Sequence, residues 1–549
     1  MATLCDYCSA LAEGLSALSP AGFELEDSLL PIDYQTFAST VYYYHPSASE
    51  LLDSALDCAL CSCVSRAVEQ YRSQYGQLDT TDDDPVIIRV KGRYLRPGEF
   101  KVLSCLIQTL NTDAICIQCS LYCDAGDVGS CSGQLFLSPP ALPGSPASLE
   151  WIQERMNYCL SNHERCNRDI AGAQLDLLPA LPTRVLDLGE GQDCSTVRLV
   201  EGAGTQAAYT ALSYCWGLPN QWPLRTTHDN LQQHTSGISM ESLEPTYRDA
   251  ICITRSLGIR YLWIDALCII QGDDQDWKHE CELMGRYYGN ARLVISASGA
   301  THPGEGCFLP GPSRDEVILP FYSHGAVTGS FKIVMSGPPF GQSGPAFSPL
   351  GNRGWATQEW WLSRRIVHFL EGYMVWSCAC LDQFRLGILS NGHTQDLVMY
   401  SDWMSIASIH SRRALSRPTD RLAAIQGLAN EFKKTRQDEY VMGFWTGELP
   451  TALLWKVGDD GRGNNRSEAL SIFPSWAWAS VACDFEEWYF ATNFAEEESF
   501  EPMATVSTIM EGGMRLRVAG CMTTGMLAES CGGEVVLLLT TGNPPKTSE

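Results

Sequence analysis

An alternation of apolar runs and amphipathic segments between residues 184 and 298 constrains the fold of this chain more than any other feature. Four short apolar runs predict buried strands, at residues 184–188, 211–216, 261–265 and 291–298. Amphipathic segments at 246–257 and 274–288 predict helices between them. Neighbouring parallel strands need a crossover connection, usually a helix, so this order predicts an α/β fold with a mainly parallel sheet flanked by helices.

The carboxyl ends of these strands are the expected ligand site, because open α/β sheets bind ligands outside that edge. The rule selects residues 214–217, 265–268 and 296–298. Asp265 stands at one of these strand ends. Its carboxylate has two interpretations: it binds a ligand hydroxyl, or it caps the backbone where the chain leaves the strand.

Glu280 is an acidic residue inside the apolar face of a predicted helix. At 100° per residue, that face of residues 277–288 consists of Trp277, Cys281, Met284, Tyr287 and Tyr288. A carboxylate in this position must lose hydration or find a partner, and either outcome shifts its pKa. Glu280 is therefore the leading catalytic candidate, with a helix cap or a structural ion pair to a nearby arginine as the alternative.

A segment rich in proline, glycine and serine divides the chain. Residues 138–148 (SPPALPGSPAS) have the composition of a stiff, exposed linker. We expect an accessory α+β region at 1–137, the α/β domain at 149–370, and a C-terminal extension at 371–549 with helical, Trp-rich and β segments.

The chain is strongly acidic, with 38 Lys and Arg residues against 64 Asp and Glu residues and a formal net charge of −26. Such a surface repels nucleic-acid phosphates and anionic lipids, so neither nucleic acid nor a membrane is an expected partner. No apolar run is long enough to cross a bilayer, and the start of the sequence does not have the pattern of a leader peptide. We therefore expect a soluble, cytoplasmic protein.

The 23 cysteines are expected to be mostly buried thiols, because disulfides are rare in the cytoplasm. Three pairs have the spacing of metal ligands, namely Cys5/Cys8, Cys58/Cys61 and Cys116/Cys119. The second pair lies in a predicted helix and the third in a predicted strand, whereas zinc ligands usually come from turns. Packed thiols are the preferred interpretation and no metal is expected, with a structural zinc site as the alternative.

Several blocks between residues 150 and 480 resemble, in their usual order, the diagnostic blocks of fungal heterokaryon-incompatibility (HET) domains. The main blocks are ALSYCWG (211–217), LGIRYLWIDALCIIQ (257–271), DWKHECELMGRYYGNA (276–291), EGCF (305–308) and RGWATQEWWLSRRIVHF (353–369). Downstream, PTDRLAAIQGLA (418–429) and FPSWAWAS (473–480) resemble an extension that often follows the domain. Residues 1–137 and 481–549 match only loosely.

This resemblance implies a role in non-self recognition and programmed cell death when genetically different hyphae fuse. HET domains are thought to be distant relatives of TIR domains, which are flavodoxin-like and associate with one another. Some TIR domains hydrolyse NAD with a glutamate on a helix that follows a central strand. Their pattern of a tryptophan shortly before this glutamate resembles Trp277 and Glu280. A TIR-like NAD glycohydrolase is therefore one hypothesis for the activity.

Under that hypothesis NAD is the substrate and no cofactor is required. Glu280 would hold the ribose hydroxyls and stabilise an oxocarbenium-like transition state. The resemblance and the strand-end rule suggest roles for five more residues: Ser213 and Tyr214 as hydrogen-bond donors, Trp216 or Trp277 as stacking rings, and Asp265 as a support for the loop. Each has a structural alternative, as a core aromatic or as a polar group that satisfies the backbone.

Two further interpretations stay open. Arg353 and Glu359 flank Trp355 in the RGWATQE block, where a buried ion pair is preferred over a role in lining the pocket. The alternative to an enzyme is a non-catalytic signalling module that self-associates, or binds another incompatibility protein, and recruits a death effector.

Overall fold

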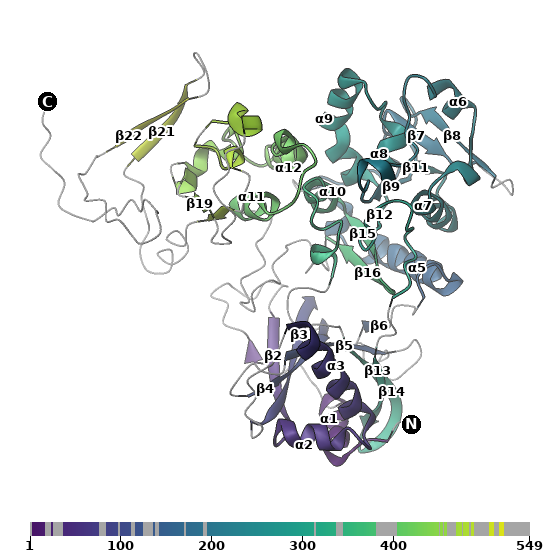
Figure 1. The fold of residues 1–549 in the computed structure, drawn as a ribbon, viewed down its shortest axis with the longest axis vertical. Helices are drawn as coiled ribbons and strands as arrows, with labels where there is room; N and C mark the ends of the chain where they lie inside the picture. Colours follow the sequence, from purple (N-terminus) through teal and green to yellow (C-terminus); the bar gives the residue numbers. More distant parts are fainter. Residues whose placement is uncertain are drawn as a thin grey trace, which may run out of the picture. The chain divides into compact units, whose positions relative to one another are not determined.

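The structure is a computed structural model, and it describes the following residues: 3–16, 24–25, 37–75, 84–96, 99–110, 116–123, 136–137, 142–169, 172–189, 195–311, 315–335, 344–379, 403–449, 451–453, 455–457, 468–474, 476–481, 485–487, 504–509 and 515–520. The chain forms two compact units, Met1–Met399 and Tyr400–Glu549. The first unit contains two large sheets and the second contains short helices and hairpins (Figure 1).

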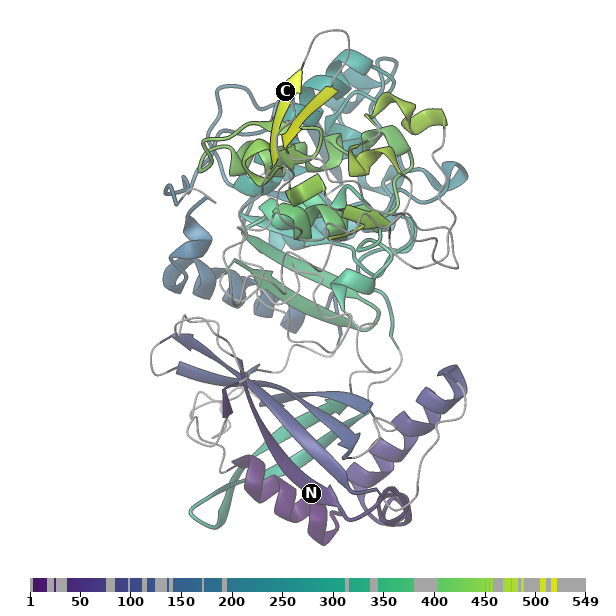
Figure 2. The same ribbon diagram turned by 90° about the vertical axis from the view of Figure 1, so that its left-hand side faces the viewer.

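The first sheet is built mainly from the N-terminal region. Its path is β1-β2-β3-β4-β5-β14-β13, with β6 beside β5. The strands are β1 (Glu24–Leu25), β2 (Phe37–His45), β3 (Val86–Arg96), β4 (Glu99–Thr109), β5 (Cys116–Cys123), β6 (Phe136–Leu137), β13 (Glu316–Ser323) and β14 (Ala326–Met335). Three helices accompany this sheet, α1 (Asp6–Ser16), α2 (Ala48–Ser54) and α3 (Ala59–Tyr75) (Figure 2). We call this eight-stranded sheet the N-terminal sheet.

The hairpin β13–β14 joins this sheet from far along the sequence. Strand β14 pairs antiparallel with β5, so that Ile333 lies opposite Leu121. The hairpin's buried side chains Leu319, Phe331 and Ile333 belong to the same core as α1 and α3. Residues 316–335 therefore complete the N-terminal sheet, although they lie within the expected 149–370 segment of the sequence.

The second sheet, which we call the central sheet, has the order β10-β8-β7-β11-β9-β12-β15-β16. Its strands are β7 (Arg184–Asp187), β8 (Thr196–Glu201), β9 (Tyr209–Ser213), β10 (Ile238–Ser239), β11 (Tyr261–Trp263), β12 (Leu293–Ser296), β15 (Arg365–Leu370) and β16 (Tyr373–Cys378). Three neighbouring pairs in this sheet are parallel, namely β11/β9, β9/β12 and β12/β15. The other pairs of the central sheet are antiparallel. The α/β prediction is confirmed, but the sheet is mixed rather than mainly parallel, because hairpin partners extend both edges.

Helices connect the parallel strands as the sequence predicts. α6 (Leu231–Ser236) and α7 (Pro245–Ser256) lie between β9 and β11, α8 (Asp265–Cys268) and α9 (Asp274–Asn290) lie between β11 and β12, and α10 (Ala356–Leu362) precedes β15. Gly258 ends α7 with φ of +67°, a conformation that glycine adopts without steric cost. α9 begins after Asp273, whose carboxylate accepts hydrogen bonds from the backbone of Gln275 and Asp276.

Helix α5 (Pro146–Asn162) begins inside the segment that was expected to be a linker. The side chain of Ser145 caps the helix by accepting a hydrogen bond from the Ser148 amide, and Pro146 occupies the first turn. These residues therefore start a helix, and their composition alone did not reveal it.

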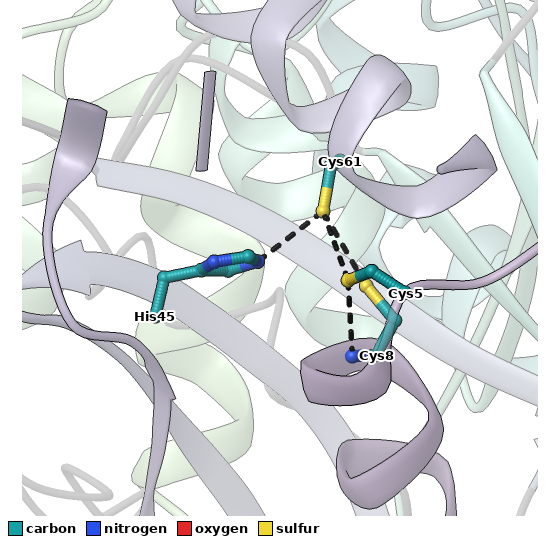
Figure 3. Close-up of side chains that lie close together, drawn as sticks. All are labelled: Cys5, Cys8, His45 and Cys61. Carbon is teal, nitrogen blue, oxygen red and sulfur yellow. Dashed lines mark hydrogen bonds between the residues drawn. The ribbon is translucent and has the colours of Figure 1, made fainter. Parts of the chain in front are cut away.

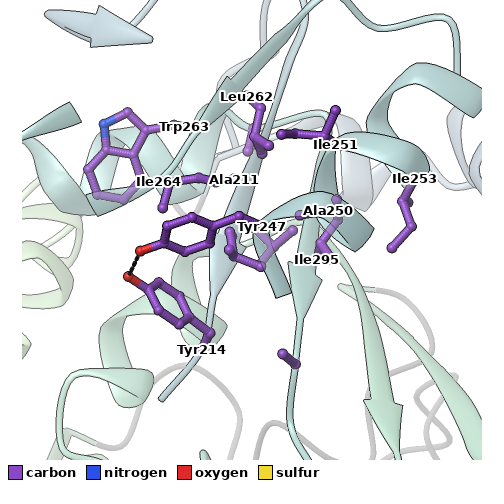
Figure 4. Close-up of a cluster of buried hydrophobic side chains, with 14 of the residues drawn as sticks. Ala211, Tyr214, Tyr247, Ala250, Ile251, Ile253, Leu262, Trp263, Ile264 and Ile295 are labelled. Carbon is purple, nitrogen blue, oxygen red and sulfur yellow. Dashed lines mark hydrogen bonds between the residues drawn. The ribbon is translucent and has the colours of Figure 1, made fainter. Parts of the chain in front are cut away.

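The core of the central sheet lies where α7 packs over β9, β11 and β12. Leu262 and Ile295 from the strands meet Tyr247, Ala250 and Ile251 from the helix, and all are buried (Figure 4). Full burial of a large aliphatic or aromatic side chain stabilises a fold by about 1.5–3 kcal/mol. This packing fixes the carboxyl ends of the parallel strands.

The second unit is organised around buried tryptophans. Its elements include α11 (Trp403–Ser411), α12 (Ala423–Phe432), β17 (Tyr440–Val441), β18 (Phe444–Trp445), β19 (Trp455–Val457), β20 (Phe485–Glu487), β21 (Ala504–Ile509) and β22 (Arg515–Gly520). The indole nitrogens of Trp403 and Trp478 both donate to the Gly443 carbonyl, at 2.7 and 3.2 Å. Among the described residues of the whole chain, no helix has the length and apolar character needed to cross a membrane.

Candidate functional site

A row of polar residues lines the carboxyl edge of the four parallel strands. In the register of the sheet, Ser213 of β9 pairs with Ser296 of β12, and Ser296 pairs with His368 of β15. Asp265 follows β11, whose Trp263 pairs with Ala211 two residues before Ser213. Asp265, Ser213 and Ser296 therefore lie at the ends of adjacent strands, with His368 beside Ser296 two residues before the end of β15, near the edge where ligands of such sheets bind.

Ser213 is hydrogen-bonded to a carboxylate from a distant part of the sequence. Its hydroxyl donates to Oε2 of Glu359 on α10, and both side chains are buried. Arg353, three residues before α10 begins, donates to the backbone carbonyl of Tyr214. The start of α10 thus lies directly against the end of β9. The sequence favours a buried ion pair for Arg353 and Glu359, and the structure places both residues beside the predicted candidates Ser213 and Tyr214.

Asp265 holds a partly buried tryptophan in place. Its Oδ2 accepts a hydrogen bond from the Trp216 indole nitrogen at 2.9 Å, and its Oδ1 accepts one from the Ala266 amide at 2.7 Å. Burial raises the pKa of Asp265, and hydrogen bonds from Tyr214 and Trp216 and the charge of Arg353 oppose this rise. Asp265 therefore both caps the backbone, as one interpretation expected, and interacts with Tyr214, Trp216 and the charge of Arg353.

Tyr214 belongs to a buried pair of phenols. Its hydroxyl oxygen lies 2.7 Å from that of Tyr247 on α7, and the two rings meet edge to face with centroids 5.4 Å apart (Figure 4). Burial is the main reason that the pKa of each hydroxyl lies well above its usual value. Both phenols remain protonated at neutral pH, so each can donate a hydrogen bond.

A serine–serine–histidine chain extends the polar row. The Ser296 and Ser298 hydroxyl oxygens are 2.8 Å apart, and the Ser298 oxygen is 3.0 Å from Nδ1 of His368. Trp360 of α10 packs edge to face on the His368 ring, with centroids 4.9 Å apart. The strand-end rule selected residues 296–298 from the sequence, but His368 was missed because it falls in the middle of a strongly apolar run.

Glu280 occupies the buried face of α9, as its helical position predicted. The side chain has no solvent exposure, and its Oε2 accepts a hydrogen bond from the Tyr287 hydroxyl at 3.0 Å. Oε1 lies 3.9 Å from a guanidinium nitrogen of Arg184, the first residue of β7. Burial raises the pKa of Glu280, while hydrogen bonds from Thr183 and Tyr287 and the charge of Arg184 oppose the rise.

The Arg184 guanidinium is shared with a second carboxylate. It contacts both oxygens of Asp276 at 2.5 and 2.7 Å and donates to the Cys268 carbonyl at 2.8 Å. Glu280 thus lies in a sealed network of charged and phenolic groups that joins α9 to β7. This matches the structural ion pair that was the alternative interpretation of Glu280. The partner is Arg184, which lies far from Glu280 in the sequence and not close to it as expected.

Trp277 lies on the same helix as Glu280 but contacts another part of the site. Its half-buried ring meets Trp355 edge to face, with centroids 6.5 Å apart. Trp355 precedes α10 and stands four residues before Glu359. The structure therefore brings together Ser213, Tyr214, Trp216 and Asp265 around Arg353 and Glu359, and connects Trp277 to this group through Trp355.

Residues 209–359 match the family model described as "Heterokaryon incompatibility protein (HET)". The matched segment begins at the first residue of β9 and ends at Glu359, so it contains three of the four parallel strands. No curated protein and no solved structure matches the chain.

Proposed function

Since the chain contains a HET domain, we propose that it acts in heterokaryon incompatibility, by detecting non-self and triggering cell death through TIR-like hydrolysis of NAD. The residue that the geometry favours as the catalytic group is Glu359, supported by Ser213. Glu280 remains a sequence-based candidate for the same reaction. The observation that carries this assignment is the contact of the Glu359 carboxylate with the carboxyl end of a central parallel strand.

The order of the parallel strands supports a relation to flavodoxin-like folds. The parallel strands follow one another in the sequence as β9, β11, β12 and β15. Across the sheet they lie in the order β11-β9-β12-β15, which is 2-1-3-4 when they are numbered by sequence. A flavodoxin-like sheet begins with this same arrangement. We propose that these four strands form the TIR-like part of the domain, to which the antiparallel edge strands are additions.

Glu359 and Glu280 both have the position in sequence that the TIR resemblance requires, and their surroundings distinguish them. A catalytic glutamate of that kind lies on a helix after a central strand, shortly after a tryptophan. α10 is the next α-helix after the central strand β12, although the hairpin β13–β14 lies between them in the sequence, and it carries Glu359 four residues after Trp355. Glu280, by contrast, has no solvent exposure and lies beside the guanidinium of Arg184. Glu359 contacts Ser213 at the strand end, in a group of residues that includes the partly buried Trp216, Asp265 and Arg353.

The proposed reaction adds water to C1′ of the nicotinamide riboside while the bond from C1′ to the ring nitrogen breaks. Nicotinamide leaves as a neutral ring because its nitrogen takes the bonding electron pair, so no strong general acid is required. The water loses its proton to solvent. The Glu359 carboxylate would hold the ribose hydroxyls and stabilise the positive charge that develops at C1′. Trp216, held by Asp265, would stack on a ring of the substrate.

The test is nicotinamide release by the purified full-length protein over a range of concentrations and with added crowding agent. We expect Glu359→Gln to reduce release by at least about 100-fold, as expected when a group that stabilises the transition state is lost. Glu282→Gln on the exposed side of α9 is the control and should retain wild-type activity. Release that is abolished by Glu280→Gln but not by Glu359→Gln would reverse the assignment. No release under any condition would remove the enzymatic proposal.

Burial of both candidate carboxylates also favours a second function, a self-associating signalling module without catalysis. Glu280 is fully buried and Glu359 is only 7% exposed. If this is the function, overexpressed Glu280→Gln and Glu359→Gln variants should each kill cells as efficiently as the overexpressed wild-type protein. Loss of killing only in the Glu359→Gln strain would favour the enzyme.

A further inference from the structure

We propose that the chain binds two structural zinc ions, one at each of two Cys3His clusters. The first, the N-terminal cluster, consists of Cys5, Cys8, His45 and Cys61, and the second, the sheet-edge cluster, of Cys159, His163, Cys166 and Cys378. Within each cluster the four potential ligand atoms lie within 4.8 Å of one another. Three cysteines and one histidine around a single point are a common ligand set of structural zinc.

The sheet-edge cluster gathers its ligands from three elements. Cys159 lies in the last turn of α5, His163 directly follows that helix, and Cys166 lies in the short helix η2 (Arg165–Asn167). Cys378 is the last residue of β16, more than 200 positions further along the chain. The spacing of the first three ligands is Cys-x3-His-x2-Cys. All four side chains are buried, so solvent does not compete for them.

The N-terminal cluster is assembled in the same way. Cys5 directly precedes α1 and Cys8 lies in its first turn, while His45 ends β2 and Cys61 lies in the first turn of α3. Figure 3 shows the three sulfur atoms and the His45 ring converging on one point between these elements. Cys5 is partly exposed and the other three are buried. Cys5 and Cys8 have the Cys-x2-Cys spacing found in many zinc sites.

The distances agree with tetrahedral coordination. With Zn–S bonds of about 2.3 Å and Zn–N bonds of about 2.0–2.1 Å, a tetrahedron places two sulfurs about 3.8 Å apart and a sulfur and a nitrogen about 3.6 Å apart. In the N-terminal cluster, Cys61 Sγ lies 3.8 Å from Cys5 Sγ, 3.5 Å from Cys8 Sγ and 3.2 Å from His45 Nε2. In the other, His163 Nδ1 lies 3.5 Å from Cys378 Sγ and 3.9 Å from Cys166 Sγ.

The groups around each cluster suit bound thiolates. Three thiolates, one neutral imidazole and Zn²⁺ carry a net charge of −1. Beside the sheet-edge cluster, the buried cation Arg365 donates to the Cys166 carbonyl at 3.1 Å and thus places a positive charge nearby. Beside the N-terminal cluster, the Tyr44 hydroxyl lies 3.2 Å from Cys8 Sγ, and the Cys58 thiol donates to Cys8 Sγ at 3.3 Å. Such outer contacts orient metal ligands and stabilise them.

Zinc explains the clusters better than packed thiols or disulfides do. A disulfide joins only two sulfurs, whereas each cluster brings three sulfurs and an imidazole nitrogen to one point. Thiolate and imidazole ligands in a four-coordinate arrangement select zinc over the oxygen-preferring ions calcium and magnesium. Each ion would join elements that are distant in sequence, and the sheet-edge ion would fasten β16 to α5.

The experiment measures zinc in the purified full-length protein by mass spectrometry of the metal, after weakly bound ions have been removed with a mild chelator. We expect about two zinc ions per chain, and about one in each of the variants Cys61→Ser and Cys378→Ser. Loading with cobalt in place of zinc should give the visible absorption of tetrahedral cobalt–thiolate sites. This absorption should fall by about half in each variant.

Matched controls separate metal binding from general damage to the fold. Cys63→Ser changes a buried thiol two residues from Cys61, and Cys307→Ser changes a buried thiol outside both clusters, so each should keep both ions. Cys378→His supplies a replacement ligand and should retain the second ion where Cys378→Ser does not. Packed thiols would show no such rescue.

Each site can fail separately. Zinc content that stays unchanged when a cluster cysteine is replaced overturns that site. A wild-type protein without zinc overturns both sites. A mass lower by two hydrogen atoms, together with two cysteines of one cluster that resist alkylation, shows a disulfide and overturns that site. The Glu359→Gln variant should hold as much zinc as the wild type, so the outcome is independent of the proposed activity.

Discussion

At the scale of single residues, the network around Glu280 shows how a correct prediction of position differs from a prediction of role. The helical pattern placed Glu280 on the apolar face, and the structure confirms that the side chain is buried. Its hydrogen bond from Tyr287 and the nearby charge of Arg184 are contacts that a buried carboxylate needs for stability. These contacts make Glu280 sensitive to changes in its partners.

Replacing Tyr287 with Phe tests this network. The change removes a hydrogen bond that favours the ionised form, so we expect the pKa of Glu280, already raised by burial, to rise further. A carboxyl with a raised pKa in the folded state contributes stability at low pH and loses that contribution as the pH rises through its pKa. Tyr287→Phe should therefore lower the free energy of unfolding by about 1–3 kcal/mol at pH 8, and by less at pH 5.

Chemical denaturation at the two pH values measures the effect. In a Glu280→Gln background no carboxylate can ionise, so the cost of Tyr287→Phe should become independent of pH. An equal cost at both pH values in the wild-type background would contradict the role given to Glu280.

At the scale of elements, the β15–β16 hairpin turns in a space that admits only glycine. Gly372 has φ of +73°, and its amide donates to the Leu309 carbonyl at 3.0 Å. A Cβ atom on Gly372 would lie 2.7 Å from the Cα of Gly311. Close packing of two backbones therefore fixes the turn between the strands that carry His368 and Cys378.

Two glycine substitutions separate the effect of conformation from that of packing. Gly258→Ala places a side chain at positive φ with no atom within 4 Å, so it should cost about 1–2 kcal/mol from conformation alone. Gly372→Ala adds a clash with backbone and should cost at least about 1 kcal/mol more. Thermal or chemical unfolding of both variants gives the comparison, and equal costs would show that the hairpin relaxes around the added methyl group.

At the scale of the whole molecule, the N-terminal sheet depends on a hairpin that follows most strands of the central sheet in the sequence. β14 completes the sheet beside β5, and the buried side chains of β13 and β14 enter the core shared with α1 and α3. The N-terminal region therefore obtains its full core only when residues 316–335 are present.

Neighbouring residues of β13 provide the test of this dependence. Leu319 is fully buried, whereas Ile318 is 48% exposed. Leu319→Ala should destabilise the N-terminal sheet by about 2–5 kcal/mol, because it leaves a cavity in the core. Ile318→Ala should change stability by less than about 0.5 kcal/mol, as is usual at the surface. Hydrogen exchange should detect the difference as lost protection in β3 to β5, far away in sequence. Similar protection in both variants would show that the sheet forms without the hairpin.

The sequence by itself determined the local features of this protein: the alternation of strands and helices, the end of α7 at Gly258 and the buried face of α9. These depend on patterns that repeat within a few residues, so they can be read along the chain. The tertiary structure alone decided which distant residues meet. It brought Ser213 to Glu359 and β14 to β5, and it joined His45 and Cys61 to the Cys5/Cys8 pair. Such contacts depend on how whole elements pack, and no local period records which elements become neighbours.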